Sequence, residues 1–265
     1  MNVLRAAVLL FAVPAFAQTW NSNAGGWNTG YGTVYGSFGL AMATQNIYQS
    51  TQQNMQRLIM RQAMIKKWGL AAVEEAERNA KAGKQGGNAE LQQQVVAAPP
   101  PPAPKNVGAF KPGKTTTFAK LGDALGSTKE EKDAVALIGA ATRDAFEAQP
   151  ETKPWRNNVA GALAFFLIGN LTIASGQQEP SDETSQALFQ ALNQALDASP
   201  EFAKATAKQK QEMYELLIGF TGVPLAIWED AKSRGDEKQM KQAQEVAAKL
   251  IELVLKTDAS QVKLQ

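Results

Sequence analysis

Apolar side chains recur at helical spacing through most of the C-terminal half of the chain. From residue 115 to residue 257 they return every three or four positions, and no stretch alternates between apolar and polar residues as a half-buried strand does. A region of this length can build a hydrophobic core of its own. We therefore predict an all-α fold in which residues 115–257 form a bundle of about five helices.

Capping residues divide this region into five predicted helices. Thr128 and Glu131 have the spacing of a capping box, in which the side chain of each residue bonds the backbone N–H of the other. Thr206 and Gln209 repeat that spacing. Gly235 is placed to end a helix, because glycine accepts the left-handed conformation of a C-cap. The predicted helices begin at Thr128, Pro154, Ser181, Thr206 and Asp236.

One predicted helix, residues 159–175, is almost entirely apolar, with the sequence VAGALAFFLIGNLTIAS. Such a segment is either a membrane span or the buried centre of the bundle. Asn170 lies within it, and no cluster of cations flanks it as a span would favour. The neighbouring amphipathic helices also need an apolar partner to cover their own stripes. We therefore expect a central buried helix.

The N-terminal part of the chain has a different pattern. Residues 18–40 are rich in glycine, asparagine, serine and aromatic residues, which opposes a helix and predicts a flexible arm. Trp20 and Trp27 in this arm are candidate binding residues, because their rings would stack on a sugar or insert into a membrane surface. An unstructured leader is the alternative.

Residues 41–82 lack proline and place apolar side chains on one stripe, which predicts a long amphipathic helix. Its middle is basic and its end is acidic. A basic amphipathic helix can lie on anionic lipid, or its charges can form the solvated face of a helix that packs against its own domain. We expect the second arrangement. The basic residues are Arg57, Arg61, Lys66 and Lys67.

Residues 83–114 are predicted to be a linker, because they combine a Gly-Lys-Gln-Gly-Gly segment, a glutamine run and a proline run. The prolines of residues 99–104 favour polyproline II, which rises about 3.1 Å per residue, so they would form a stiff spacer of about 19 Å. Residues 258–265 are predicted to be a short tail.

Residues 1–17 have the three parts of a secretory signal peptide in the right order. Arg5 supplies the positive charge, residues 6–13 supply the apolar core, and residues 15–17 (Ala-Phe-Ala) supply the small-residue cleavage site. We expect an exported protein, periplasmic or extracellular, whose mature chain begins at Gln18. No cysteine follows the site, so the pattern does not predict a lipoprotein.

The chain contains neither cysteine nor histidine. Their absence excludes disulfides, Ser-His-Asp and Cys-His catalysis, and imidazole metal ligands. We expect no metal and no other cofactor. The formal net charge is +2 without a concentrated basic surface, so nucleic acid is not an expected partner.

Four residues form a narrow polar or small strip on the fourth predicted helix: Glu212, Glu215, Gly219 and Gly222. The strip is either a solvated edge or a groove that something approaches closely. Carboxylates three residues apart on a helix have Cβ atoms about 5–6 Å apart, near the carboxylate separation of retaining glycosidases. Those enzymes place the pair on opposite sides of the scissile bond, which two neighbours on one helix cannot easily do. We therefore expect no catalytic residues here, and we keep Glu212 and Glu215 as candidate binding residues.

Three short segments are similar to the recurring segments of domain-of-unknown-function family 6683, whose members are uncharacterised exported bacterial helical proteins. The resemblance covers about residues 110–256 and implies origin and architecture without a mechanism. It makes Asn158, Gln211 and Glu215 candidates for a shared polar site or for hydrogen bonds between core helices. The segments are Asn157-Asn158-Val159-Ala160, Ala162-Leu163-Ala164-Phe165-Phe166 and Gln211-Glu212-Met213-Tyr214-Glu215.

These features predict a non-enzymatic binding or scaffolding role in the bacterial cell envelope. The expected partners are a cell-wall polymer, a membrane surface or an envelope protein. The alternative from another class is a carboxylate-dependent hydrolase of envelope polysaccharide, in which Glu215 would be essential.

Overall fold

The computed structural model describes residues 40–84, 87–97, 103, 105–255 and 257–262. The predicted signal peptide and the predicted arm with Trp20 and Trp27 lie outside these residues, except for Leu40. Every regular element in the described part is a helix, and its β pairing is limited to an isolated bridge between Ala109 and Asn158. The all-α prediction is confirmed.

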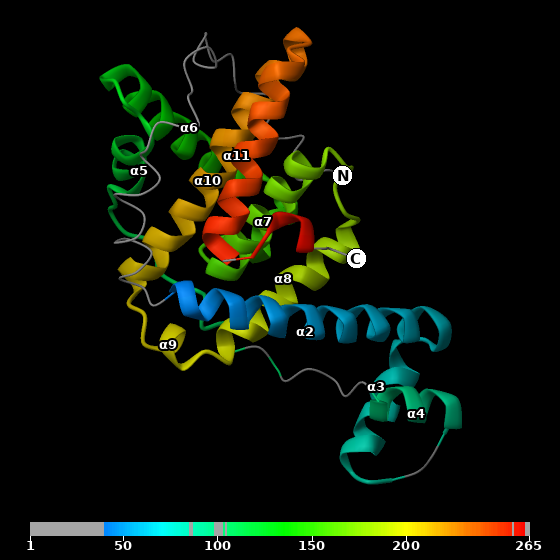
Figure 1. The fold of residues 1–265 in the computed structure, drawn as a ribbon. Helices are drawn as coiled ribbons and strands as arrows, with labels where there is room; N and C mark the ends of the chain where they lie inside the picture. Colours follow the sequence, from blue (N-terminus) through cyan, green and yellow to red (C-terminus); the bar gives the residue numbers. More distant parts are fainter. Residues whose placement is uncertain (1–39, 85–86, 98–102, 104, 256, 263–265) are drawn as a thin grey trace.

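Five long helices and two short ones make up the bundle in the described residues from 105 onward, with one 3₁₀ turn between α6 and α7 and another after α11 (Figure 1). The helices are α5 Thr117–Leu125, α6 Lys129–Ala148, α7 Val159–Ser175, α8 Asp182–Asp197, α9 Pro200–Ala203, α10 Ala207–Arg234 and α11 Glu237–Leu255, and the turns are η4 Pro150–Trp155 and η5 Ala259–Gln261.

The local capping signals form as the sequence indicates. Thr128 and Glu131 make both hydrogen bonds of a capping box at the start of α6. Thr206 and Gln209 do the same at the start of α10. Gly235 ends α10 in the left-handed conformation, with φ of 67°. Each signal lies within a few residues of sequence, which is why it is readable without knowledge of the fold.

The apolar helix α7 is the centre of the bundle. It is buried along nearly its whole length and packs against α8, α10 and α11. Its start differs from the prediction, because Pro154 lies inside η4 and α7 begins five residues later at Val159, with Asn158 as N-cap. Between them Asn157 has a positive φ of 51°, which interrupts a right-handed helix. In the part of the chain that the structure describes, no helix has the length and apolarity needed to cross a membrane.

The predicted helix 41–82 is two helices, α2 Leu40–Trp68 and α3 Leu70–Lys81. They are separated at Gly69, whose φ of 85° cannot belong to a right-handed helix. The long helix α2 lies across α8 in the lower part of the bundle (Figure 1). Its residues Thr51, Met55 and Leu58 are buried, so the expectation that this region packs against its own domain holds for α2.

The predicted linker contains a helix. This helix, α4 Ala89–Ala97, begins after Asn88, whose side-chain oxygen accepts the backbone N–H of Glu90 at 3.0 Å. With two buried positions in nine residues, α4 has too weak a periodicity to be recognised from sequence. It packs on α3 and on the end of α2, away from the bundle (Figure 1). We call α3, α4 and the end of α2 from Met60 to Trp68 the extension. Its small core is Met64, Val73, Ala76, Leu91 and Val95.

Half of the predicted basic face is neutralised inside the extension. Arg61 Nε lies 2.6 Å from Glu77 Oε1 on α3, and this hydrogen bond raises the pKa of Arg61. Lys67 Nζ lies 2.8 Å from Glu90 Oε1 on α4. The other two basic side chains of the stretch are exposed. Ion pairs therefore interrupt the basic middle of α2, and only the folded arrangement of the three helices reveals them.

The last part of the predicted linker is bound to the bundle. We call residues 105–116 the strap. It runs from the end of α8, past the start of α7, to the start of α10. On the way Gly108 accepts the N–H of Val159 at 3.0 Å, and Phe110 donates to the carbonyl of Asn157 at 3.0 Å. The strap is therefore a fixed layer of the bundle. The predicted proline spacer, residues 99–104, lies outside the described residues except for Ala103.

Candidate functional site

Gln211 in the first turn of α10 holds the strap. Gly113 donates its N–H to Gln211 Oε1 at 2.7 Å, and Gln211 Nε2 donates to the carbonyl of Gly113 at 2.8 Å. The side-chain amide thus pairs with the backbone of the strap as another peptide group would. Its second N–H goes to Glu215 Oε1 at 2.9 Å, so every hydrogen of the amide is used.

Glu215, one turn further along α10, has a carboxylate in the protein interior. Its side chain is 2% exposed. Oε1 accepts the hydrogen bond from Gln211 and lies 3.9 Å from Arg143 Nη1. Oε2 is buried and has no hydrogen-bond partner among the described residues. A buried oxygen without a partner costs about 1–3 kcal/mol, so the site keeps a carboxylate at a cost in stability.

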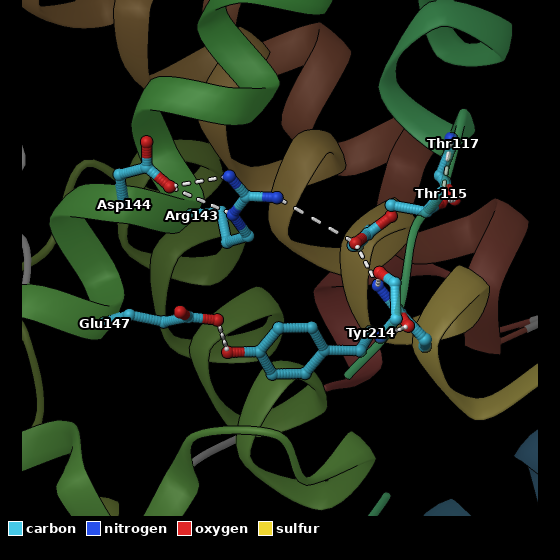
Figure 2. Close-up of polar contacts among 9 residues, drawn as sticks. Thr115, Thr117, Arg143, Asp144, Glu147 and Tyr214 are labelled. Carbon is cyan, nitrogen blue, oxygen red and sulfur yellow. Dashed lines mark hydrogen bonds and ion pairs between the residues drawn. The ribbon is translucent and has the colours of Figure 1, made fainter. Parts of the chain in front are cut away.

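Arg143 on α6 is the cation of this cluster (Figure 2). Its Nη2 lies 2.7 Å from Asp144 Oδ1, and its guanidinium carbon lies 5.4 Å from the ring centre of Phe118. Burial alone would lower the pKa of Arg143, but the hydrogen bond with Asp144 and the charges of Asp144, Glu215 and Glu147 outweigh it and raise that pKa. One guanidinium therefore faces three carboxylates.

Tyr214, the neighbour of Glu215 on α10, completes the cluster. Its hydroxyl donates to Glu147 Oε1 on α6 at 2.8 Å (Figure 2). Its ring lies edge-on to Phe110 of the strap at 5.3 Å between centres and to Phe146 at 6.3 Å. Burial, together with the charge of Glu147, raises the pKa of Tyr214 well above its ordinary value. The phenol is therefore a neutral hydrogen-bond donor that connects α10, α6 and the strap.

Glu212 takes a different partner. Its Oε1 lies 3.5 Å from Lys120 Nζ on α5, and its side chain is partly exposed. Glu215 is turned inward toward Gln211 and Arg143. The two carboxylates are committed to different neighbours, and this geometry does not favour a pair that flanks a sugar.

Gly219 and Gly222, the two glycines of the polar strip on α10, lie where other helices approach closely. A Cβ at Gly219 would overlap Leu121 Cδ2 on α5, and a Cβ at Gly222 would overlap Thr142 Oγ1 on α6. Both glycines are buried. At Gly219 and Gly222 the strip is therefore covered, because α5 and α6 approach α10 closely there, while Glu212 at the start of the strip is partly exposed.

Asn158 belongs to a second polar cluster. Its Oδ1 accepts the N–H of Ala160 at 2.9 Å, and its Nδ2 donates to Asn193 Oδ1 on α8 at 3.4 Å. Asn193 in turn donates to Asn106 Oδ1 of the strap at 2.7 Å. Asn158 is thus not hydrogen-bonded to Gln211 or Glu215, and the single shared polar site suggested by the resemblance is two clusters in the structure.

Asp197 anchors the start of the strap beside this second cluster. Its carboxylate accepts three successive backbone N–H groups, at 2.6 Å from Lys105, 3.3 Å from Asn106 and 2.7 Å from Val107. The sequence analysis missed Asp197, Arg143 and Tyr214. The available signal for Arg143 was a cation that follows the small and apolar stretch Leu137–Ala141. Asp197 and Tyr214 gave no signal, because their partners lie far away in the sequence.

Within the described residues, no group of three or more Asp or Glu side chains is arranged to hold a metal ion. The fold and the two clusters define a class: an α-helical bundle whose interior polar side chains fasten its own strap and helices. The whole chain, residues 1–265, matches the model of a family described as "Family of unknown function (DUF6683)", and the protein belongs to that family. A search of the curated proteins and a search of the solved structures each found no match.

Proposed function

We propose that this protein is a non-enzymatic binding or scaffolding protein of the bacterial cell envelope, and that it binds through the part of the chain that precedes the strap. The observation that carries the proposal is the placement of exposed apolar side chains. Four large hydrophobic residues are strongly exposed in the described part of the chain, and Met60, Leu70 and Val96 lie on α2, α3 and α4. The fourth, Leu137, lies on α6.

The surroundings of these side chains favour a docking role for the extension. Val96 borders a half-open groove of about 670 Å³ between α3 and α4, which Ala80, Ala89 and Ala97 also line. Exposed apolar surface that its own chain does not cover is typical of interaction sites. The ion pairs of Arg61 and Lys67 reduce the charge available to anionic lipid, so an apolar surface on an envelope component is favoured over a lipid headgroup.

The experiment measures how much of the mature wild-type protein, of a triple variant of the extension and of a control variant of the bundle sediments with each of three envelope preparations. The preparations are purified cell-wall sacculi, an envelope membrane fraction and anionic vesicles. Substitution of Met60, Leu70 and Val96 by serine should reduce pelleting with an envelope component severalfold. Leu137→Ser is the control, because it removes a still more exposed apolar side chain from the bundle. Circular dichroism verifies that each variant is folded.

The arm is tested in the same assay with Trp20→Ala combined with Trp27→Ala, for which we expect a partial loss. Binding that disappears at high salt and is confined to vesicles would assign the contact to lipid instead. Equal pelleting by the wild type and the triple serine variant, or no pelleting by the wild type, would refute the proposed role of the extension.

A further inference from the structure

A half-open groove of about 760 Å³ lies where the C-terminal ends of α7 and α11 meet η5. Its volume is within the range of small-molecule sites. The residues of the Gln211 and Asn158 clusters do not line it, so it is a separate feature of the bundle. Its apolar lining consists of buried or half-buried side chains, which include Leu171, Ala174, Ala248 and Val262.

Among the described residues that line the groove, the charged side chains are all acidic. Glu252 and Asp258 line it, and its described lining residues include no lysine or arginine. Ser260 donates its hydroxyl at 2.6 Å and its N–H at 2.8 Å to Asp258 Oδ1, and these bonds lower the pKa of Asp258. Asp258 is therefore ionised at neutral pH, and its second oxygen is not used in these bonds.

Two helix ends add to the negative potential. The last turn of α7 lines the groove with Thr172 and Ser175, and Glu252 lies in the last turn of α11. The C-terminus of a helix carries about half a negative charge, which basic residues in the last turn commonly offset. Neither α7 nor α11 has a basic residue in its last turn. Two helix ends whose last turns hold no basic residue and two carboxylates therefore meet at one groove with an apolar lining.

We propose that this groove binds a small organic cation, namely a primary ammonium compound with an apolar chain. The ammonium group would lie between the carboxylates of Glu252 and Asp258, where the helix ends also favour positive charge. The chain would cover Leu171, Ala174 and Ala248, which supply apolar contact and no hydrogen bonds. The inference does not depend on the envelope role, because it concerns a different face of the protein.

Hexylamine is the probe, and hexan-1-ol is its neutral analogue of nearly equal size. Both are titrated into the mature wild-type protein by isothermal calorimetry and by chemical-shift mapping. We expect saturable binding of hexylamine at the groove, at least about tenfold tighter than that of hexan-1-ol. The preference should weaken with salt, because part of it is electrostatic.

Three variants assign the preference to the carboxylates. Glu252→Gln combined with Asp258→Asn should abolish the preference for the amine while keeping the shape of the groove, and Glu252→Gln alone should reduce it. Glu245→Gln, which removes an exposed carboxylate of α11 that does not line the groove, should leave it unchanged. Three results would overturn the proposal: no saturable binding of hexylamine, equal affinity for hexylamine and hexan-1-ol, or an amine preference that survives in the double variant.

Discussion

Substitution of alanine for Gly222 should destabilise the bundle, although alanine is the better helix former. Gly222 lies inside α10 where Thr142 of α6 approaches it. A Cβ at this position would overlap Thr142 Oγ1 and lie 2.9 Å from Thr142 Cβ and 3.2 Å from Thr142 Cγ2. The Cβ of a residue cannot move without its backbone, so α6 itself would have to shift.

Two opposing contributions set the magnitude. Replacing glycine by alanine in a helix interior gains about 1 kcal/mol of helix propensity. Forcing an extra carbon into a packed core costs about 1–3 kcal/mol. Because the overlap involves a β-branched side chain close to its backbone, the upper half of that range applies. We expect a net loss of about 1–2 kcal/mol in the free energy of unfolding, or a fall of about 2–8 °C in the melting temperature for a protein of this size.

Gly219→Ala is the matched control on the same helix. Its Cβ would overlap Leu121 Cδ2, the far end of a flexible side chain, and would otherwise stay 3.7 Å or more from its neighbours. A rotation of Leu121 relieves that overlap, so the loss should be smaller than for Gly222→Ala. A double substitution of Gly222→Ala with Thr142→Ala should recover part of the stability, because it removes Oγ1 and Cγ2 but keeps the Cβ of residue 142, 2.9 Å away.

Urea unfolding followed by circular dichroism measures the wild type, Gly222→Ala, Thr142→Ala and the double variant, which close the double-mutant cycle, and Gly219→Ala as the control. The hydroxyl of Thr142 bonds the carbonyl of Ile138 within its own helix at 2.8 Å, so its removal leaves no partner unsatisfied in another segment. We expect a favourable coupling of about 1 kcal/mol between the two substitutions. The close-approach reasoning is wrong if Gly222→Ala is as stable as the wild type, or if the two effects simply add.

Four further predictions concern the strap, the polar clusters and the N-terminus. Asp197→Ala should lower the free energy of unfolding by about 1–3 kcal/mol and speed proteolysis within the strap, because three backbone N–H groups lose their acceptor; limited proteolysis and urea melts measure both. Stability should fall as the pH rises above the ordinary tyrosine pKa of 10.0, since unfolded tyrosine then loses a proton that folded Tyr214 keeps; the fall should be shallower in Tyr214→Phe. Arg143→Ala should cost about 2 kcal/mol or more and exceed the cost of Glu215→Gln, because it leaves a buried carboxylate without its cation; the double variant should be more stable than Arg143→Ala alone. The intact mass of protein exported by its host should correspond to a chain that begins at Gln18, and retention of Met1 would contradict the export prediction.

The sequence was sufficient for features that depend on neighbouring residues. The capping boxes at Thr128 and Thr206 and the C-cap at Gly235 involve contacts within one turn, and they set the helix boundaries correctly. The break at Gly69 was missed because the stripe of apolar residues continues across it, and a positive φ leaves no mark on periodicity. Helix α4 was missed because its stability depends on packing against α3.

The candidate site could be predicted only in part, because it depends on contacts between residues that are distant in the sequence. The sequence could mark Gln211 and Glu215 as polar residues on an apolar helix, which indicated a special role for them. Their partners Gly113 and Arg143 lie 98 and 72 residues away, and no pattern in one sequence assigns such pairs. Whether a polar strip is solvated or covered by another helix depends on the tertiary structure. The sequence alone could therefore not decide between a solvated edge and a close approach.

The hydrogen bonds that hold the strap at its two ends also limit the conformational freedom of the extension. Without cysteine, the chain holds the strap non-covalently, with Asp197 at its start and Gln211 near its end. The extension is therefore tied to the bundle on both sides, by α2 packed on α8 and by the strap. Closing a chain segment between two fixed points restricts the conformations it can adopt. A restricted extension loses less entropy when its exposed apolar side chains bind a partner, and binding is stronger for the same contacts. If the proposed role is correct, Asp197→Ala should therefore weaken envelope binding although Asp197 lies outside the extension.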